Sequence, residues 1–306
     1  MQLGVNSEGG CHLCPRLCGA ARDVARGFCG APANPEAATV TLHTGEEPPL
    51  STPGGIVNIF FAHCNLHCIY CQNGDIAAAD VEPSLVRLRT VDAIADEACR
   101  LLPRSNGLLG LVTAAHYIHL VPALLDAIRQ RGFSPTVVYN TSAYEKVDSL
   151  RTLEGLVDIY LPDLKYMDPV LARRYSHAED YPDVAAKAIL EMKRQVGATL
   201  KCDDGGTAFR GLIVRHLVLP GHSENSMQCL QWLDDHFPPS LHLSLMAQYF
   251  PPCSGLPSPL DHTLTAAEYE PVAQRARDLG FRGWLQQIDA NANYRPHFHL
   301  SDTPFL

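Results

Sequence analysis

The sequence predicts an α/β fold, a partial or closed (β/α) barrel of six to seven parallel strands with a small N-terminal cysteine-rich metal-binding segment. Short apolar runs rich in β-branched residues alternate with helical patterns along most of the chain, which is typical of a parallel sheet with right-handed crossovers. Four cysteines precede this alternation and three follow its first strand directly. With 306 residues and 46% hydrophobic content, the chain can bury one barrel-sized core.

The first element is a metal-binding segment within residues 1–53, and residues 54–306 are predicted to form the barrel domain. Cys11, Cys14, Cys18 and Cys29 have the spacing C-x2-C-x3-C-x10-C, interrupted by turn-forming Pro and Gly. Four thiolates so spaced are typical of a closed four-coordinate site. A piece this short needs its metal to fold. The spacing allows a zinc ion or an auxiliary iron-sulfur cluster, and both remain open.

Residues 31–53 are rich in Pro, Gly and Glu, and this composition predicts a linker over the barrel surface. Residues 39–42 are predicted to be a short edge strand within it.

The first barrel strand, predicted over residues 56–61, leads into Cys64, Cys68 and Cys71 with the spacing C-x3-C-x2-C. One loop with this spacing can wrap a compact metal centre. Three thiolates can bind three irons of a 4Fe-4S cluster and leave the fourth iron open. The alternative is a structural zinc ion with His63 or His67 as its fourth ligand.

The remaining elements are predicted in order from their periodicity and breakers. Thr90 caps a helix over residues 91–102, which ends before Pro103. Strands follow at 110–113, 135–139, 157–161, 212–219, 241–246 and 281–285, and helices at 117–130, 144–156, 168–175, 182–195, 224–237 and 266–279. Because chemistry in such barrels lies at the carboxyl ends of the strands, the polar residues just after each strand are the candidate site residues.

Those strand ends supply amide, hydroxyl, carboxylate and cationic groups. The candidates are His116, Asn140, Ser142, Asp163, Lys165, Arg215 and Gln248. Each residue alone is more often an ordinary rim residue, but their coincidence at one edge favours a binding site.

The loop Cys64–Cys71, with Tyr70 before its last cysteine, resembles the C-x3-C-x-aromatic-C motif of the radical SAM superfamily. The segments CHLCPRLC (11–18), YNTSAY (139–144), VDIYLPDLKY (157–166), GLIVRHLVLPG (211–221) and LSLMAQYFP (243–251) resemble the uncharacterised branch related to pyruvate formate-lyase activating enzymes. This resemblance covers residues 11–285. It implies a 4Fe-4S cluster that reductively cleaves S-adenosyl-L-methionine (SAM) to a 5'-deoxyadenosyl radical, which abstracts hydrogen from a substrate.

The resemblance also implies roles for individual residues. Asp163 and Lys165 match the family's Asp-x-Lys, in which the lysine contacts the methionyl carboxylate. Tyr70 is expected near the adenine, and His116 is expected at the amino group in place of a Gly-Gly-Glu motif that this chain lacks. The full set of expected cofactor-binding residues is Tyr70, Asn73, His116, Asn140, Ser142, Asp163, Lys165, Arg215 and Gln248.

Three sites, one of them a pair of residues, depart from the family pattern. Asn140 stands where better-known activases carry an aspartate, and Gln248 stands where they carry a histidine. Ala62 and His63 stand where the family has a small residue and a glycine.

The expected substrate is a glycyl-radical enzyme, and the alternatives are a small molecule, another peptide, or a non-catalytic zinc or iron-sulfur module. A one-electron donor such as flavodoxin or ferredoxin is implied. A net charge of -9 without a long basic run argues against nucleic acid as a partner. No apolar stretch is long enough to span a membrane and no signal peptide is recognisable, so a cytoplasmic location is expected.

Overall fold

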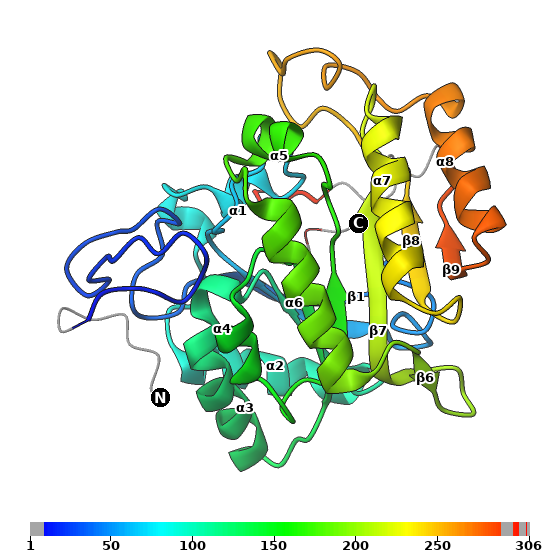
Figure 1. The fold of residues 1–306 in the computed structure, drawn as a ribbon. Helices are drawn as coiled ribbons and strands as arrows, with labels where there is room; N and C mark the ends of the chain where they lie inside the picture. Colours follow the sequence, from blue (N-terminus) through cyan, green and yellow to red (C-terminus); the bar gives the residue numbers. More distant parts are fainter. Residues whose placement is uncertain (1–8, 289–295, 300–303, 305–306) are drawn as a thin grey trace.

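The computed structural model describes residues 9–288, 296–299 and 304. Figure 1 labels the elements. The strands are β1 (Ala37–His43), β2 (Ile56–Phe61), β3 (Leu108–Val112), β4 (Thr136–Thr141), β5 (Ile159–Pro162), β6 (Lys201–Cys202), β7 (Ala208–Leu217), β8 (His242–Met246) and β9 (Arg282–Leu285). The helices are α1 (Gly74–Ala77), α2 (Val91–Leu101), α3 (Val121–Gln130), α4 (Val147–Arg151), α5 (Pro169–Ser176), α6 (Tyr181–Val196), α7 (Ser223–His236) and α8 (Ala266–Asp278). Short 3-10 helices lie at Pro83–Leu85, Leu102–Arg104 and Ala115–Leu120.

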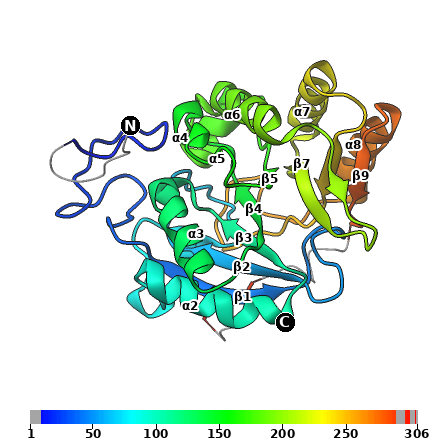
Figure 2. The ribbon, with the colours of Figure 1, turned by 90° about the horizontal axis from the view of Figure 1, so that it is seen from below.

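The strands form one mixed sheet in the order β1-β2-β3-β4-β5-β7-β8-β9, with β6 beside β7. From β2 onward, seven strands along this path run parallel, while β1 is antiparallel to β2 and β6 to β7. The predicted parallel α/β arrangement is therefore confirmed. Within the described residues no pairing joins β9 back to β1, so the sheet is open and the closed barrel is not found. Figure 2 shows the strands in an arc, with the major helices along its outer side.

Burial on both faces explains the apolar strand runs. Val57, Ile59 and Phe61 of β2 belong to the large core cluster, together with apolar residues of α2 and α3. Their neighbour Ile56 belongs to a separate inner cluster with residues of β3, β4, β5 and β7. Successive strand residues point to opposite faces, so a strand covered on both sides needs apolar residues at nearly every position.

The segment expected as a linker contributes to the sheet itself. The predicted edge strand is confirmed and is longer than expected, since β1 pairs with β2 from His43↔Ile56 to Ala37↔Phe61. The loop after β1 then crosses beneath the inner face, where the Leu50 side chain is fully buried in the inner cluster. The sheet thus begins before residue 54, because the small apolar residues of β1 are buried despite the Pro- and Glu-rich composition around them.

Several predicted helix boundaries are correct. At the start of α2, the Thr90 side chain caps the helix by accepting a hydrogen bond from the Ala93 amide (3.1 Å). The helix predicted over residues 144–156 is reduced to α4. Ala143 has a left-handed φ of 60°, and Glu145 bonds back to side chains of β4. These bonds keep the chain in a turn, because local side-chain hydrogen bonds compete with helix formation. No helix in the described ranges is long and apolar enough to cross a membrane.

Candidate functional site

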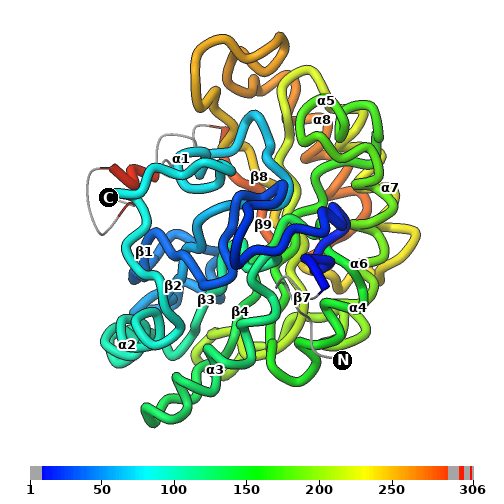
Figure 3. The backbone as a smooth tube through the Cα atoms, turned by 90° about the vertical axis from the view of Figure 1, so that its left-hand side faces the viewer, coloured from blue at the N-terminus to red at the C-terminus, as the bar shows by residue number. Residues whose placement is uncertain are grey.

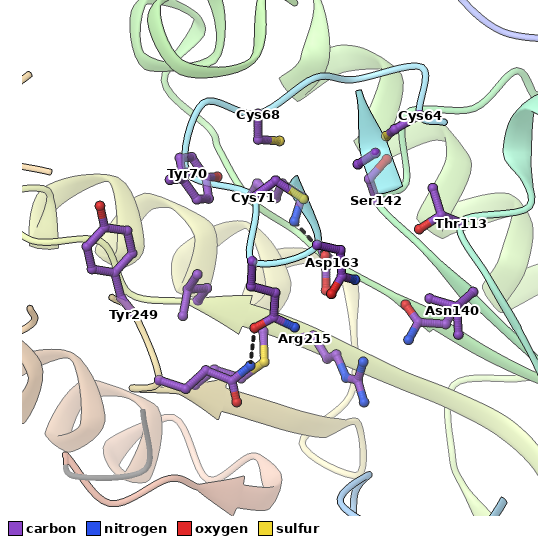
Figure 4. Close-up of a pocket in the computed structure, with 18 of the residues that line it drawn as sticks. Cys64, Cys68, Tyr70, Cys71, Thr113, Asn140, Ser142, Asp163, Arg215 and Tyr249 are labelled. Atoms are coloured by element: carbon purple, nitrogen blue, oxygen red, sulfur yellow. Dashed lines mark hydrogen bonds and ion pairs between the residues drawn. The ribbon is translucent and has the colours of Figure 1, made fainter. Parts of the chain in front are cut away.

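A cavity of about 670 Å³ lies at the carboxyl ends of the parallel strands, beneath residues 62–73, which we call the cluster loop. Its size is typical of small-molecule sites. Its wall includes most of the residues predicted from the sequence: Cys64, Cys68, Tyr70, Cys71, Asn73, Asn140, Ser142, Asp163, Lys165, Arg215 and Gln248. Figure 4 shows the three thiols above the polar side chains that follow the strands.

The cluster loop uses left-handed backbone at His63 (φ 72°) and His67 (φ 57°), a conformation that glycine adopts more readily. Hydrogen bonds stabilise His63 there: Nε2 lies 2.7 Å from Glu36 Oε2, and Nδ1 lies 3.2 Å from the Ala78 carbonyl oxygen. His63 therefore has a backbone conformation that is more typical of glycine. Because both ring nitrogens are engaged, His63 is not free to be a zinc ligand.

The three thiols are partly buried, and their charged forms repel one another. Burial, together with the neighbouring Cys68 and Cys64 sulfurs, raises the pKa of Cys71 to about 12. Burial likewise raises the pKa values of Cys64 and Cys68, while the Lys165 ammonium opposes this shift. Thiolates in such surroundings need a bound cation.

The three thiols of the cluster loop do not mark a single-ion position. Among the described residues, no three His, Cys, Asp or Glu side chains converge as they would around one metal ion. The ligands of a 4Fe-4S cluster bind different irons and need not converge on one point. A cluster and a zinc ion therefore both stay predictions for this loop.

The end of α5 supports the loop beside Cys68. Ser176 Oγ donates to Cys68 Sγ (3.0 Å), and the Ile69 amide donates to the Tyr175 carbonyl (2.9 Å). The Tyr166 hydroxyl lies 2.8 Å from Ser176 Oγ and donates to the Tyr70 hydroxyl (2.6 Å). The roles of Ser176 and Tyr166 could not be read from the sequence, because these contacts join segments far apart in the chain.

Lys165 carries a buried positive charge at the cavity wall. Its Nζ lies 2.5 Å from Asp163 Oδ2, and the two side chains are only 17% and 21% exposed. Burial would lower the pKa of Lys165, but the Asp163 carboxylate and the Cys68 sulfur raise it more, so the net shift is upward. The lysine therefore stays charged. The Tyr181 hydroxyl fixes its backbone by accepting from the Lys165 amide (3.0 Å) and donating to the Asp163 carbonyl (2.7 Å).

A buried carboxyl group supports the end of β4 and the turn after it, where Asn140 and Ser142 reach the cavity wall. Tyr139 OH donates to Glu145 Oε2 (3.0 Å), and Thr141 Oγ1 donates to Glu145 Oε1. Burial raises the pKa of Glu145 to about 7 and exceeds the opposing effect of both hydrogen bonds. At neutral pH this group is therefore close to half-protonated.

Replacing Glu145 by glutamine should remove a pH-dependent loss of stability. The pKa of Glu145 is higher in the folded state than in the unfolded state. Its contribution to the free energy of unfolding is therefore complete below pH 4.5 and is lost as the pH rises through about 7. Between these two pH values the free energy of unfolding of the wild type should fall by on the order of 2 to 3 kcal/mol, whereas that of Glu145→Gln should not show this fall. Anaerobic urea unfolding at pH 5.5 and pH 8.5 measures this. The control is Glu179→Gln, at an exposed site; equal pH dependence in wild type and Glu145→Gln would contradict the assignment.

Arg215 lines the cavity, but its guanidinium is held by two glutamates from the loop after β1. Nε and Nη2 donate to the Glu47 carboxylate at 2.7 and 2.6 Å, and Nη2 also donates to Glu46 Oε2. Glu46 in turn accepts from Asn58 Nδ2 (2.7 Å). The sequence identified the arginine but not these partners. In the structure Arg215 connects β7 to the opposite end of the sheet.

His116 is placed differently from its predicted contact with the cofactor. Its side chain is 1% exposed and does not belong to the described cavity wall. The ring lies behind the cluster loop, with Nε2 2.8 Å from the Ala62 carbonyl oxygen. Burial and the nearby Arg22 guanidinium lower its pKa well below the usual range. The neutral ring therefore supports the loop from outside the described cavity wall, and a contact of His116 with the amino group stays a prediction.

A row of amides joins the cluster loop to the last strands. Gln248 Nε2 donates to Gln72 Oε1 (3.1 Å), and Gln286 Nε2 donates to Gln248 Oε1 (2.8 Å). All three residues line the cavity. Only Gln248 was predicted, because Gln72 and Gln286 follow no recognisable motif.

The N-terminal cysteines lie outside the cavity. Cys11, Cys14 and Cys29 are buried and Cys18 is exposed. Burial raises the pKa of Cys14 to about 12, with smaller effects from Cys29 and Cys11, so these sulfurs lie near one another. The four thiols do not converge on a single-ion position within the described residues. A metal at this place stays a prediction, with zinc and an iron-sulfur cluster as its alternatives.

Comparisons with known proteins give an uncharacterised relative and a structural match of low identity. No family model matches it. "Uncharacterized protein MJ0674" of Methanocaldococcus jannaschii is 26% identical over 283 residues, which cover 90% of this chain and 77% of that protein. A solved structure described as "Native anSMEcpe with bound AdoMet" matches with a TM-score of 0.49 and 11% identity, over 72% of this chain and 60% of that one. The chain thus spans less than two thirds of that structure, and function has to be argued from the cavity.

Proposed function

We propose that the protein is a radical SAM enzyme that abstracts hydrogen from a substrate. The observation that carries the proposal is one cavity that holds three thiols from a single loop opposite a buried, charged lysine. A non-catalytic metal module would have no use for a charged lysine facing a cavity of this size.

The chain's residues divide into two groups in this proposal. Cys64, Cys68 and Cys71 would bind three irons of a 4Fe-4S cluster. A cluster held this way would leave one iron open for SAM. Its added electron would serve to split SAM into methionine and a 5'-deoxyadenosyl radical, and this radical would take a hydrogen atom from the substrate. Ser176 would tune the cluster, because hydrogen bonds to sulfur influence its reduction potential.

The second group would hold SAM. The Lys165 ammonium would bind the methionyl carboxylate as a charge-assisted hydrogen bond. Asn140 and Ser142, both on the cavity wall, offer amide and hydroxyl groups for the ribose. Tyr70 and Tyr249, whose ring centroids are 6.2 Å apart, offer an aromatic wall for the adenine.

A glycyl-radical enzyme is the proposed substrate, on the strength of the sequence resemblance to activating enzymes. A small molecule or another peptide is the alternative. A cytoplasmic flavodoxin or ferredoxin would supply the electron.

The reaction itself tests the proposal. Protein reconstituted anaerobically with iron and sulfide, then reduced with dithionite in the presence of SAM, should release 5'-deoxyadenosine and methionine in equal amounts. Liquid chromatography with mass detection measures both products. Cys64→Ala should release neither, whereas Cys253→Ser, at an exposed cysteine outside the cavity wall, should behave as the wild type. Absence of 5'-deoxyadenosine from protein with a complete cluster would refute the proposal.

A further inference from the structure

We propose that Arg16, in the N-terminal segment between Cys14 and Cys18, is a positioning residue for the cluster loop. Its guanidinium ties that segment, the loop and the end of α5 into one unit. The inference depends on one part of the proposed function, namely that the loop cysteines hold a cluster. The N-terminal segment lies on the side of the molecule that faces the viewer in Figure 3.

Arg16 donates to four backbone carbonyls from two separate elements. Nε donates to the Asn65 carbonyl (2.9 Å) and Nη2 to the Leu66 carbonyl (3.3 Å), both between the ligand cysteines Cys64 and Cys68. Nη2 also donates to the Ser176 carbonyl (3.0 Å), and Nη1 donates to the His177 carbonyl. One side chain thus bridges the cluster loop and the end of α5.

The chemistry of these acceptors explains why the residue is an arginine. Carbonyls in the last turn of a helix lack intrahelical donors, and the helix dipole makes that end attractive to a cation. A guanidinium has five donors in one plane and a flat face for stacking. The Arg16 Cζ atom lies 3.9 Å from the centroid of the Phe28 ring. The ammonium of a lysine could not bind both elements and stack at the same time.

A short path leads from Arg16 to a cluster ligand. Ser176, whose carbonyl accepts from Arg16, donates its hydroxyl to Cys68 Sγ at 3.0 Å. On the loop side, the Phe28 ring stacks on His67 with centroids 4.7 Å apart. Movement of the α5 end or of the loop would therefore change the position and hydrogen bonding of Cys68. Arg16 acts on the cluster only through these residues.

Removal of Arg16 should loosen the cluster without removing a ligand. Loss of an outer-shell partner typically weakens metal binding about 10-fold or more. Arg16→Ala should therefore release cluster iron to a chelator about 10-fold faster than the wild type. Its reduction potential should become more negative, since the hydrogen bond to Cys68, which stabilises the reduced state, is weakened. The paramagnetic resonance spectrum of the reduced cluster should change in line shape.

The test compares Arg16→Ala with Arg173→Ala in the full chain, reconstituted anaerobically. Arg173 lies on the same helix α5 but is 64% exposed, and its ion-pair partner is Glu179 (3.6 Å). Arg173→Ala should match the wild type in iron release, potential and spectrum. If Arg16→Ala also matched it in all three, the inference would be overturned. Arg16→Lys, which keeps the charge but cannot bind both elements, should shift the three readouts in the same direction, and it is the variant to use if Arg16→Ala does not fold.

These readouts separate the inference from the proposed reaction. A wild type that holds a cluster but does not cleave SAM would refute the function and leave the Arg16 comparison valid. If the wild type held no cluster, amide hydrogen exchange over residues 64–72 would decide whether Arg16 bridges the two elements. Faster exchange in Arg16→Ala than in Arg173→Ala would support a bridging role for Arg16, and equal exchange would exclude it.

Discussion

Replacement of Lys165 by methionine should raise the SAM concentration needed for half-maximal cleavage about 100-fold, with cluster iron unchanged. Methionine has a similar length but lacks the ammonium that faces the cavity beside Asp163. A hydrogen bond between charged partners contributes about 1.5 to 3 kcal/mol, more than one between neutral groups. The Asp163 carboxylate, left unpaired, would also repel the SAM carboxylate. The loss of binding free energy should therefore lie at the upper end of this range.

The matched control is Lys187→Met on α6, where the lysine is exposed to solvent. It should leave SAM dependence and iron content unchanged. Iron counted in each preparation separates weaker SAM binding from cluster loss. Normal SAM dependence of Lys165→Met with a full cluster would show that the lysine does not bind the cofactor.

Replacement of Arg215 by methionine should lower the free energy of unfolding by about 3 to 5 kcal/mol. The structure buries the Glu46 and Glu47 carboxylates against this one guanidinium. Removal of one partner of a buried ion pair leaves uncompensated charge in a poorly solvated place. Anaerobic urea unfolding at pH 7.5 measures the change.

Two comparisons isolate the cause. Arg129→Met removes an arginine that pairs with Asp126 at the surface, and it should cost about 1 kcal/mol or less. Combination of Arg215→Met with Glu46→Gln and Glu47→Gln should recover much of the lost stability, because no unpaired charge remains. If the triple variant were as unstable as Arg215→Met, packing rather than charge would explain the loss.

Local patterns in the sequence were sufficient to predict the strands and the residues that follow them. The run before Cys64 is β2 as expected, and parallel strands bring Asn140, Asp163 and Lys165 to one edge. These features depend on short-range periodicity and on the geometry of parallel strands, both of which a single sequence carries.

Contacts between residues that are far apart in the sequence could not be predicted. Arg215 had the right chemistry for a carboxylate ligand, but Glu46 and Glu47, 169 and 168 residues away, occupy its guanidinium. Arg16 meets Ser176 over a separation of 160 residues. Such pairs leave no periodic signal. The composition of residues 31–53 predicted a surface linker with a short edge strand, and it gave no sign of the full length of β1 or of the buried loop after it.

The antiparallel pairing of β1 with β2 means that the two predicted domains cannot be cut apart at residue 54. A shortened protein that begins there would expose the hydrogen-bonding edge of β2 to other chains, which invites aggregation. It would also lack the carboxylates that neutralise Arg215 and the arginine that braces the cysteine loop. The segment before residue 54 and the sheet are therefore expected to fold together rather than as separable modules.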